Sequence, residues 1–79
     1  METQYRSHAV ERMIQRGLSP RDVDDVLQNP DGVIRQSMDK VIAYKNIEDR
    51  TDNSIAVVAV EGDQAWEVIT VMINFEVRQ

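Results

Sequence analysis

Residues 7–23 of this 79-residue chain read SHAVERMIQRGLSPRDV and predict two short helices joined by a tight turn. Ser7 suits a helix N-cap. The apolar residues that follow have the i, i+1, i+4 and i+5 spacing of one helical face: Ala9, Val10, Met13 and Ile14. Gly17 can adopt a positive φ and is a natural end for this helix. The first helix is therefore expected over residues 7–16.

A second helix is expected to begin at Ser19. Ser19 is a good N-cap, and Pro20 suits the first helical position. Three acidic residues fall in the first turns, where the helix dipole favours negative charge: Asp22, Asp24 and Asp25. The segment NPDG at residues 29–32 cannot easily continue a helix. The two helices should form an αα-hairpin, because only two or three residues link them.

Four later segments predict β-strands, at residues 33–36, 40–47, 54–60 and 65–77. A polar loop is expected over residues 48–53. Residues 54–60 are almost wholly apolar, which is typical of a central strand covered on both faces. The expected fold is α+β, a single domain over residues 1–79. Its two N-terminal helices would pack on one face of an antiparallel sheet of about four strands.

The last expected strand alternates along its length. One face carries Ala65, Glu67, Ile69, Val71, Ile73, Phe75 and Val77, and this set is expected against the helices. The other face carries Trp66, Val68, Thr70, Met72, Asn74 and Glu76. This second face is too apolar for an ordinary solvated surface, so a partner, a second copy or a substrate is expected to cover it. The partner-binding candidates are Trp66, Val68 and Met72. The alternative is that the loop at 48–53 or the C-terminus folds over this face.

The composition narrows the classes of function. The formal net charge is −5, which argues against broad affinity for nucleic acid, since such affinity rests on neutralising phosphates. The basic residues Arg6, Arg12 and Arg16 nevertheless keep open the alternative of a local cationic site near the N-terminus. The chain has no cysteine and no apolar run near the roughly 20 residues of a membrane span, and its polar first residues lead us to expect no secretory signal. A cytoplasmic location without membrane attachment is expected.

One stripe of the first expected helix could carry chemistry. His8, Arg12 and Arg16 stand at i, i+4 and i+8, which places them on one side of the helix, opposite the apolar face. A neutral imidazole is a competent general base, and guanidinium groups hold phosphates and stabilise oxyanions. Phosphodiester cleavage by a 2′-hydroxyl needs this combination of a base and cations. The alternative is that the stripe is the ordinary solvent face of an amphipathic helix.

A metal or cofactor site is not expected. The chain has one histidine and no cysteine, and its first acidic cluster is explained by the start of the second helix. It also lacks a glycine-rich phosphate loop and a serine nucleophile elbow.

The segment HAVERMIQRGLS at residues 8–19 resembles the opening of a family of small bacterial domains of unknown function. The signature of that family is H-A-x-x-R-M-x-x-R-G-I-S, then a second helix ending near N-P, and a final strand with V-x-T-V. Asn29-Pro30 and the segment VITV at residues 68–71 match these later landmarks. The resemblance therefore covers nearly the whole chain in order.

That family is similar in layout to the RelE/ParE-like toxins of toxin–antitoxin pairs, and to barnase-like and colicin-type ribonucleases. The resemblance implies a RelE-like fold and metal-independent RNA cleavage, with RNA and a cognate antitoxin as partners. It also implies an active site near His8, Arg12, Arg16 and Thr70. Because the chain is acidic and such toxins are usually basic, a non-catalytic interaction or regulatory domain is the alternative. That domain would use the open sheet face to form a homodimer or bind a partner. An acidic mimic of nucleic acid ranks after both.

Overall fold

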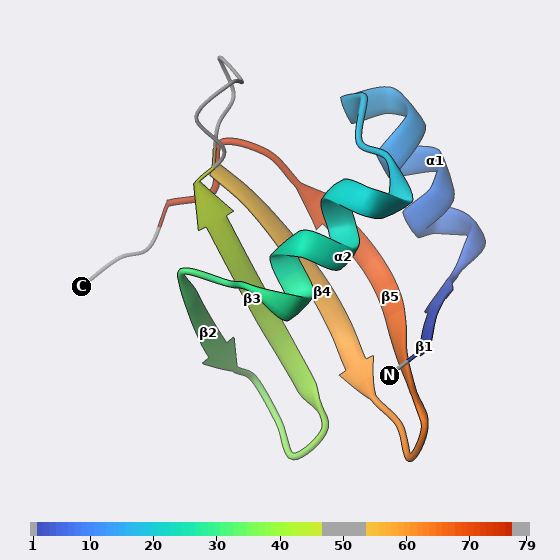
Figure 1. The fold of residues 1–79 in the computed structure, drawn as a ribbon, viewed down its shortest axis with the longest axis vertical. Helices are drawn as coiled ribbons and strands as arrows, with labels where there is room; N and C mark the ends of the chain where they lie inside the picture. Colours follow the sequence, from blue (N-terminus) through green and yellow to red (C-terminus); the bar gives the residue numbers. More distant parts are fainter. Residues whose placement is uncertain (1, 47–53, 77–79) are drawn as a thin grey trace.

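The computed structural model describes residues 2–46 and 54–76. These residues form one sheet with both helices packed on the same face (Figure 1). The elements in chain order are β1 (Glu2–Tyr5), α1 (Ser7–Arg16), α2 (Pro20–Gln28), β2 (Gly32–Arg35), β3 (Lys40–Asn46), β4 (Ser54–Glu61) and β5 (Ala65–Met72). Neither helix is long and apolar enough to cross a membrane.

Helix α1 has the predicted bounds and ends as its sequence indicates. Gly17 adopts φ 66°, and its N–H donates to the carbonyl of Ile14 (3.2 Å). The N–H of Leu18 donates to the carbonyl of Met13 (2.8 Å), which completes a Schellman motif. The predicted N-cap is wrong, because Arg6 caps α1 and no side chain accepts from the first turn.

Helix α2 begins with the predicted cap. The N–H of Asp22 donates to Ser19 Oγ (3.2 Å), and the N–H of Ser19 donates to Asp22 Oδ2 (2.8 Å). This reciprocal capping box satisfies two backbone donors that the helix itself leaves unpaired. Pro20 occupies the first turn, where its missing N–H costs nothing.

The sheet has the strand order β1-β5-β4-β3-β2 within the described residues, and it is mixed. The four predicted strands correspond to β2, β3, β4 and β5, which pair antiparallel in sequence. The prediction missed β1, which pairs parallel with β5 from Glu2 opposite Ala65 to Tyr5 opposite Val68. The sheet is therefore five-stranded and mixed, not four-stranded and antiparallel. β1 was not predicted because the segment ETQY is short and polar. It forms a strand because it pairs with β5, a segment distant in the sequence.

Some predicted bounds also change. β5 ends at Met72 rather than at residue 77, since Asn74 takes a left-handed conformation (φ 53°) that turns the chain. The predicted end of the second strand at residue 47, the loop at 48–53 and residue 77 lie outside the described residues.

The main core lies between the helices and the sheet. Ala9 and Met13 of α1 and Val23 and Val26 of α2 pack on the strands. The strand residues in this core are Ala43, Ile55, Val57, Ala59, Val68 and Val71. Residues 55–59 of β4 are all buried, so the predicted central strand is confirmed. The predicted apolar face of α1 is only partly packed, because Ile14 remains 75% exposed.

A β-bulge in β5 changes which residues face the helices. Val58 pairs with Thr70 and the next residue, Ala59, pairs with Val68, so Ile69 is an extra residue in β5. The side-chain alternation is interrupted at this point.

The bulge overturns part of the predicted face assignment. Trp66 and Val68 lie on the helix side, whereas the strict alternation placed them on the other face. Ile69 belongs to the cluster on the other face, again opposite to the prediction. Beyond the bulge, Val71 packs under the helices and Met72 lies on the other face, as predicted.

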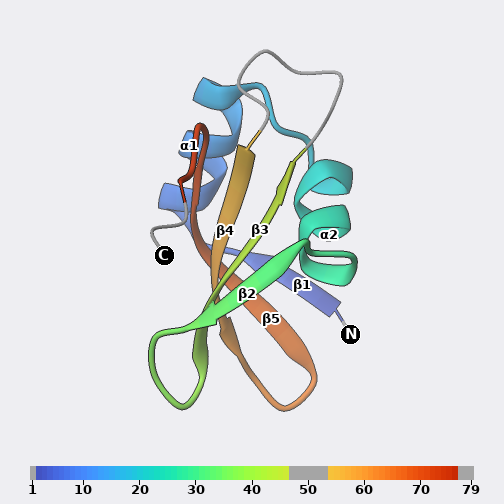
Figure 2. The same cartoon turned by 90° about the vertical axis from the view of Figure 1, so that its left-hand side faces the viewer.

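The face of the sheet away from the helices, called the open face below, is apolar. Its cluster contains Ile42, Ala56 and Val58, with Ile34, Tyr44, Ile69, Met72 and Phe75 packed against them. Figure 2 shows α2 on one side of β3 and β4 and the chain after β5 turning on the other side. The N–H of Phe75 donates to the carbonyl of Ser54 (3.0 Å), and its ring lies 5.7 Å from that of Tyr44. Residues after β5 therefore cover part of the open face.

A polar contact ties β1 to α2. The Tyr5 hydroxyl donates to Asp24 Oδ1 (3.3 Å) beside the main core. Burial of the phenol, with the negative charge of Asp24, raises the pKa of Tyr5 to about 12.

We expect Ser19→Ala to lower the free energy of unfolding by about 1 kcal/mol, because the capping box is lost. Urea denaturation of both proteins measures this difference. Ser7→Ala is the matched control and should change stability much less, because Ser7 does not cap α1. Equal losses in the two variants would contradict this assignment of the caps.

The Tyr5 phenol should titrate with a midpoint near 12 in the folded protein. Subtracting the tyrosinate absorbance of Tyr5→Phe from that of the parent isolates this group, and circular dichroism at each pH confirms that the fold persists. The folded state favours the neutral phenol. The contribution of Tyr5 to the free energy of unfolding is therefore fully present below pH 10.0 and is lost as the pH rises through about 12. Asp24→Asn should lower the midpoint. If Tyr5 of the folded parent titrates with a midpoint at the ordinary value of 10.0, the contact between Tyr5 and Asp24 is contradicted.

Candidate functional site

The three candidate residues of α1 lie along its surface. His8 and Arg16 are exposed, while Arg12 is partly buried. Arg12 Nη1 donates to Gln15 Oε1 (3.0 Å) on the same helix. Because Arg12 is partly buried, the stripe borders the packed side of α1 instead of lying fully opposite to it. The predicted grouping on one helix is otherwise present.

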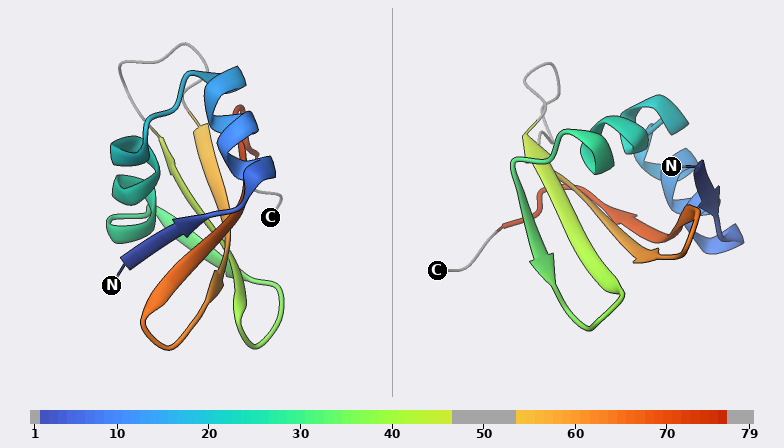
Figure 3. Two further views of the ribbon diagram at one scale, coloured as in Figure 1. Left: turned by 90° about the vertical axis from the view of Figure 1, so that its right-hand side faces the viewer. Right: turned by 60° about the horizontal axis from the view of Figure 1, so that its bottom comes forward.

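The junction of β1 and α1 fixes the start of this stripe against β5. The N–H of Arg6 donates to the carbonyl of Val68 (3.1 Å). The Arg6 guanidinium also forms an ion pair with the Glu67 carboxylate, and both side chains are about half exposed. Figure 3 shows β1 beside the first part of β5 and α1 beside its later part. His8 therefore stands two residues beyond a point that is held by both backbone and side chain.

Thr70 lies in β5, two residues beyond Val68. It is partly buried and faces the open face, because it pairs with Val58. Ala9 and Met13 of α1, by contrast, pack on the other face of the sheet. The structure therefore places Thr70 and α1 on opposite faces of the sheet and does not bring Thr70 together with the α1 stripe.

The three partner-binding candidates do not share a face. Val68 is fully buried under the helices, and Trp66 packs against the same core. Met72 is the member of the set that lies on the open face. The apolar surface expected from β5 does exist, but residues of β2, β3 and β4 contribute most of it.

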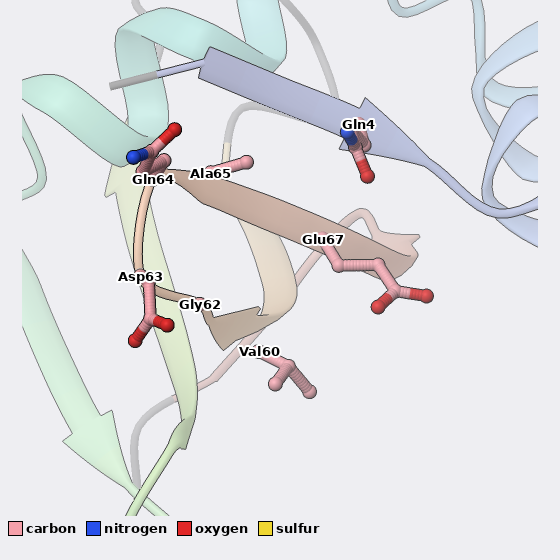
Figure 4. Close-up of a pocket in the computed structure, with 7 residues that line it drawn as sticks. All are labelled: Gln4, Val60, Gly62, Asp63, Gln64, Ala65 and Glu67. Atoms are coloured by element: carbon pink, nitrogen blue, oxygen red, sulfur yellow. The ribbon is translucent and has the colours of Figure 1, made fainter.

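Sequence reasoning missed a hollow lined in part by Glu67, the ion-pair partner of Arg6 (Figure 4). Its volume is about 200 Å³, and its lining residues are Gln4, Val60, Gly62, Asp63, Gln64, Ala65 and Glu67. Gln4 and Val60 both pair with Glu67 from neighbouring strands, so the three side chains share the open face. A signal in the sequence for this hollow was the polar pair of Gln4 and Glu67. These two residues can be recognised as a pair only once β1 is known to pair with β5.

The acidic cluster of α2 has structural partners, although Asp22 is the member that lies in the first turn as predicted. Asp22 closes the capping box and Asp24 accepts from Tyr5. Asp25 Oδ2 lies 2.9 Å from Lys45 Nζ of β3, and the hydrogen bond from Lys45 lowers the pKa of Asp25. Among residues 2–46 and 54–76, no three histidine or acidic side chains are placed to hold a metal ion.

Comparison with known proteins identifies the family but not its activity. No curated protein and no solved structure matches the chain significantly. One family model matches residues 5–73, from the end of β1 to just beyond β5, which includes both helices and four complete strands. The resemblance to a domain of unknown function is confirmed at this level, whereas no match links the chain to RelE/ParE toxins or to ribonucleases. The chain belongs to the family described as a domain of unknown function, DUF4258.

Proposed function

We propose that the domain is a toxin-type ribonuclease of the RelE/ParE kind that cleaves RNA without a metal ion. The observation that carries this proposal is the anchoring of Arg6 to β5 through its backbone and its guanidinium. This anchoring holds the first turn of α1, with the exposed His8, beside β5. His8, Arg12 and Arg16 follow one another along α1 from this point, with His8 and Arg16 exposed.

His8 would act as the base of the reaction. It would take the proton of the ribose 2′-hydroxyl, whose oxygen then attacks the neighbouring phosphorus. The imidazolium would return that proton to the departing 5′-oxygen. The ribose that carried the attacking oxygen would then hold a cyclic phosphate. Arg12 and Arg16 would hold the phosphate and stabilise its additional negative charge. Thr70 faces the other side of the sheet, so its supporting role would require the RNA to pass around the edge of β5.

The start of α1 favours an anionic substrate. Among residues 2–46 and 54–76, no side chain caps its first turn and no acidic residue lies in that turn, in contrast to the capping box of α2. Backbone N–H groups at a helix N-terminus attract phosphates. The net charge of −5 opposes RNA binding over the rest of the surface, so contact would be concentrated at this end of α1.

The second candidate function is protein interaction through the open face. The observation that favours it is the apolar cluster around Ile42 and Val58, which no helix covers among the described residues. Met72→Glu would place a charge on this face and should weaken association with a partner. Trp66→Ala is unsuitable as a test, because Trp66 packs on the helix side.

The ribonuclease proposal predicts that induced expression of the parent arrests bacterial growth and degrades total RNA, whereas His8→Ala does neither. The purified parent should cleave single-stranded RNA in the presence of a chelator. His8→Ala should be slower by about 10²–10⁴-fold, the usual contribution of a general base. Arg12→Ala should also lose activity.

The matched control is Arg21→Ala, which removes an exposed arginine from α2 rather than α1. It should retain growth arrest and RNA cleavage. Thermal unfolding of every variant separates loss of chemistry from loss of fold. Intact RNA and normal growth with the folded parent would overturn the proposal, as would equal effects of Arg12→Ala and Arg21→Ala.

A further inference from the structure

The outer edge of β2 can accept another strand. β2 is the last strand of the sheet in the described residues, and it pairs with β3 on one side. The N–H of Gln36 donates to the carbonyl of Lys40 (2.9 Å), which sets the phase of the ladder. Hydrogen-bonded positions alternate along an antiparallel strand, so Gly32 and Ile34 also bond toward β3. The backbone N–H and C=O groups of Val33 and Arg35 therefore point outward.

The side chains along this edge do not protect it. Val33 is 53% exposed, and Met38 in the turn after β2 is 93% exposed. Edge strands are usually guarded by proline or by charges that oppose pairing. The charge here is Arg35, but its Nη1 donates to the carbonyl of Met38 (2.6 Å) and its Nη2 lies 4.0 Å from Glu61. These contacts bind the Arg35 guanidinium within its own chain, so its charge does not block another strand from pairing with β2.

We infer that a second copy of this chain pairs with β2 in antiparallel orientation, centred on Ile34. In this register, Val33 of each copy lies opposite Arg35 of the other, and these residues carry the outward backbone groups. Each N–H then meets a C=O across the two-fold axis. No other register centred within β2 uses all of these groups, because centring on Val33 would require the N–H of Asp31, which donates to the carbonyl of Tyr44 (2.8 Å).

The side chains fit the same register. Ile34 packs in the apolar cluster of the open face. Ile34 of the second copy would lie directly opposite it and continue that cluster across the interface. The exposed Met38 turn of each copy would lie beside the chain at Pro30 of the other. Because each copy carries a net charge of −5, added salt should strengthen the pairing. The inference does not depend on the proposed ribonuclease activity.

Disulfide trapping tests the register, since the chain has no cysteine of its own. Ile34→Cys would place two sulfurs on directly opposed, non-hydrogen-bonded residues with Cα atoms about 4.5 Å apart, within the range of a disulfide. Val33→Cys would place them on residues offset along the strands, with Cα atoms roughly 8 Å apart and beyond that range. Oxidation should therefore dimerise Ile34→Cys faster. Val33 is the more exposed residue, so random collision would give the reverse order and would overturn the proposal.

Sedimentation tests the association without cysteine. The parent should show a reversible monomer–dimer equilibrium that tightens with salt. Val33→Lys should weaken it by at least about tenfold, because a charge enters the pairing edge. Val10→Lys introduces the same change at an exposed valine of α1 and should leave the equilibrium unchanged. A parent that stays monomeric at every concentration would overturn the proposal, as would equal weakening by the two variants.

Discussion

The burial of β4 on both faces is the constraint on which the rest of the structure depends. Five consecutive residues, 55–59, are buried, so each face of the sheet must be covered by other groups. The helices cover one face with Ala9, Met13, Val23 and Val26. The open face is covered less completely, by neighbouring strand residues and by Phe75 from the chain after β5. The arrangement of helices, bulge and C-terminal turn follows from these two unequal coverings, because apolar burial is the dominant favourable term in folding.

Local chemistry made the helices predictable. Gly17 and Ser19 each act through a few nearby backbone groups, so the end of α1 and the start of α2 can be derived from sequence alone. β1 and the bulge at Ile69 depend on pairing between distant segments, and short-range patterns cannot reveal them. The missed bulge is also the reason that Trp66 and Val68 were assigned to the wrong face.

In the candidate site, too, features within one element were predictable and features that depend on strand pairing were not. The stripe of His8, Arg12 and Arg16 was predictable, because all three residues belong to one helix. The contact of Arg6 with Glu67 and the neighbouring hollow were not, since they exist only where β1 pairs with β5. The helix pattern also could not show that α1 would begin beside β5. The pairing of β1 supplies that information by anchoring the residue before α1.

The two edges of the sheet have different surroundings, which makes the two proposals compatible. On the β1 side, α1 continues along β5 and carries the cationic stripe. On the β2 side, the described residues leave the backbone of Val33 and Arg35 facing outward. A dimer formed through β2 would double the sheet and place the two α1 stripes at its far ends. Pairing would therefore bury neither stripe, and the acidic copies would keep their cationic ends apart. Dimerisation and RNA cleavage should accordingly be separable, since residues at opposite edges that share no contacts act independently.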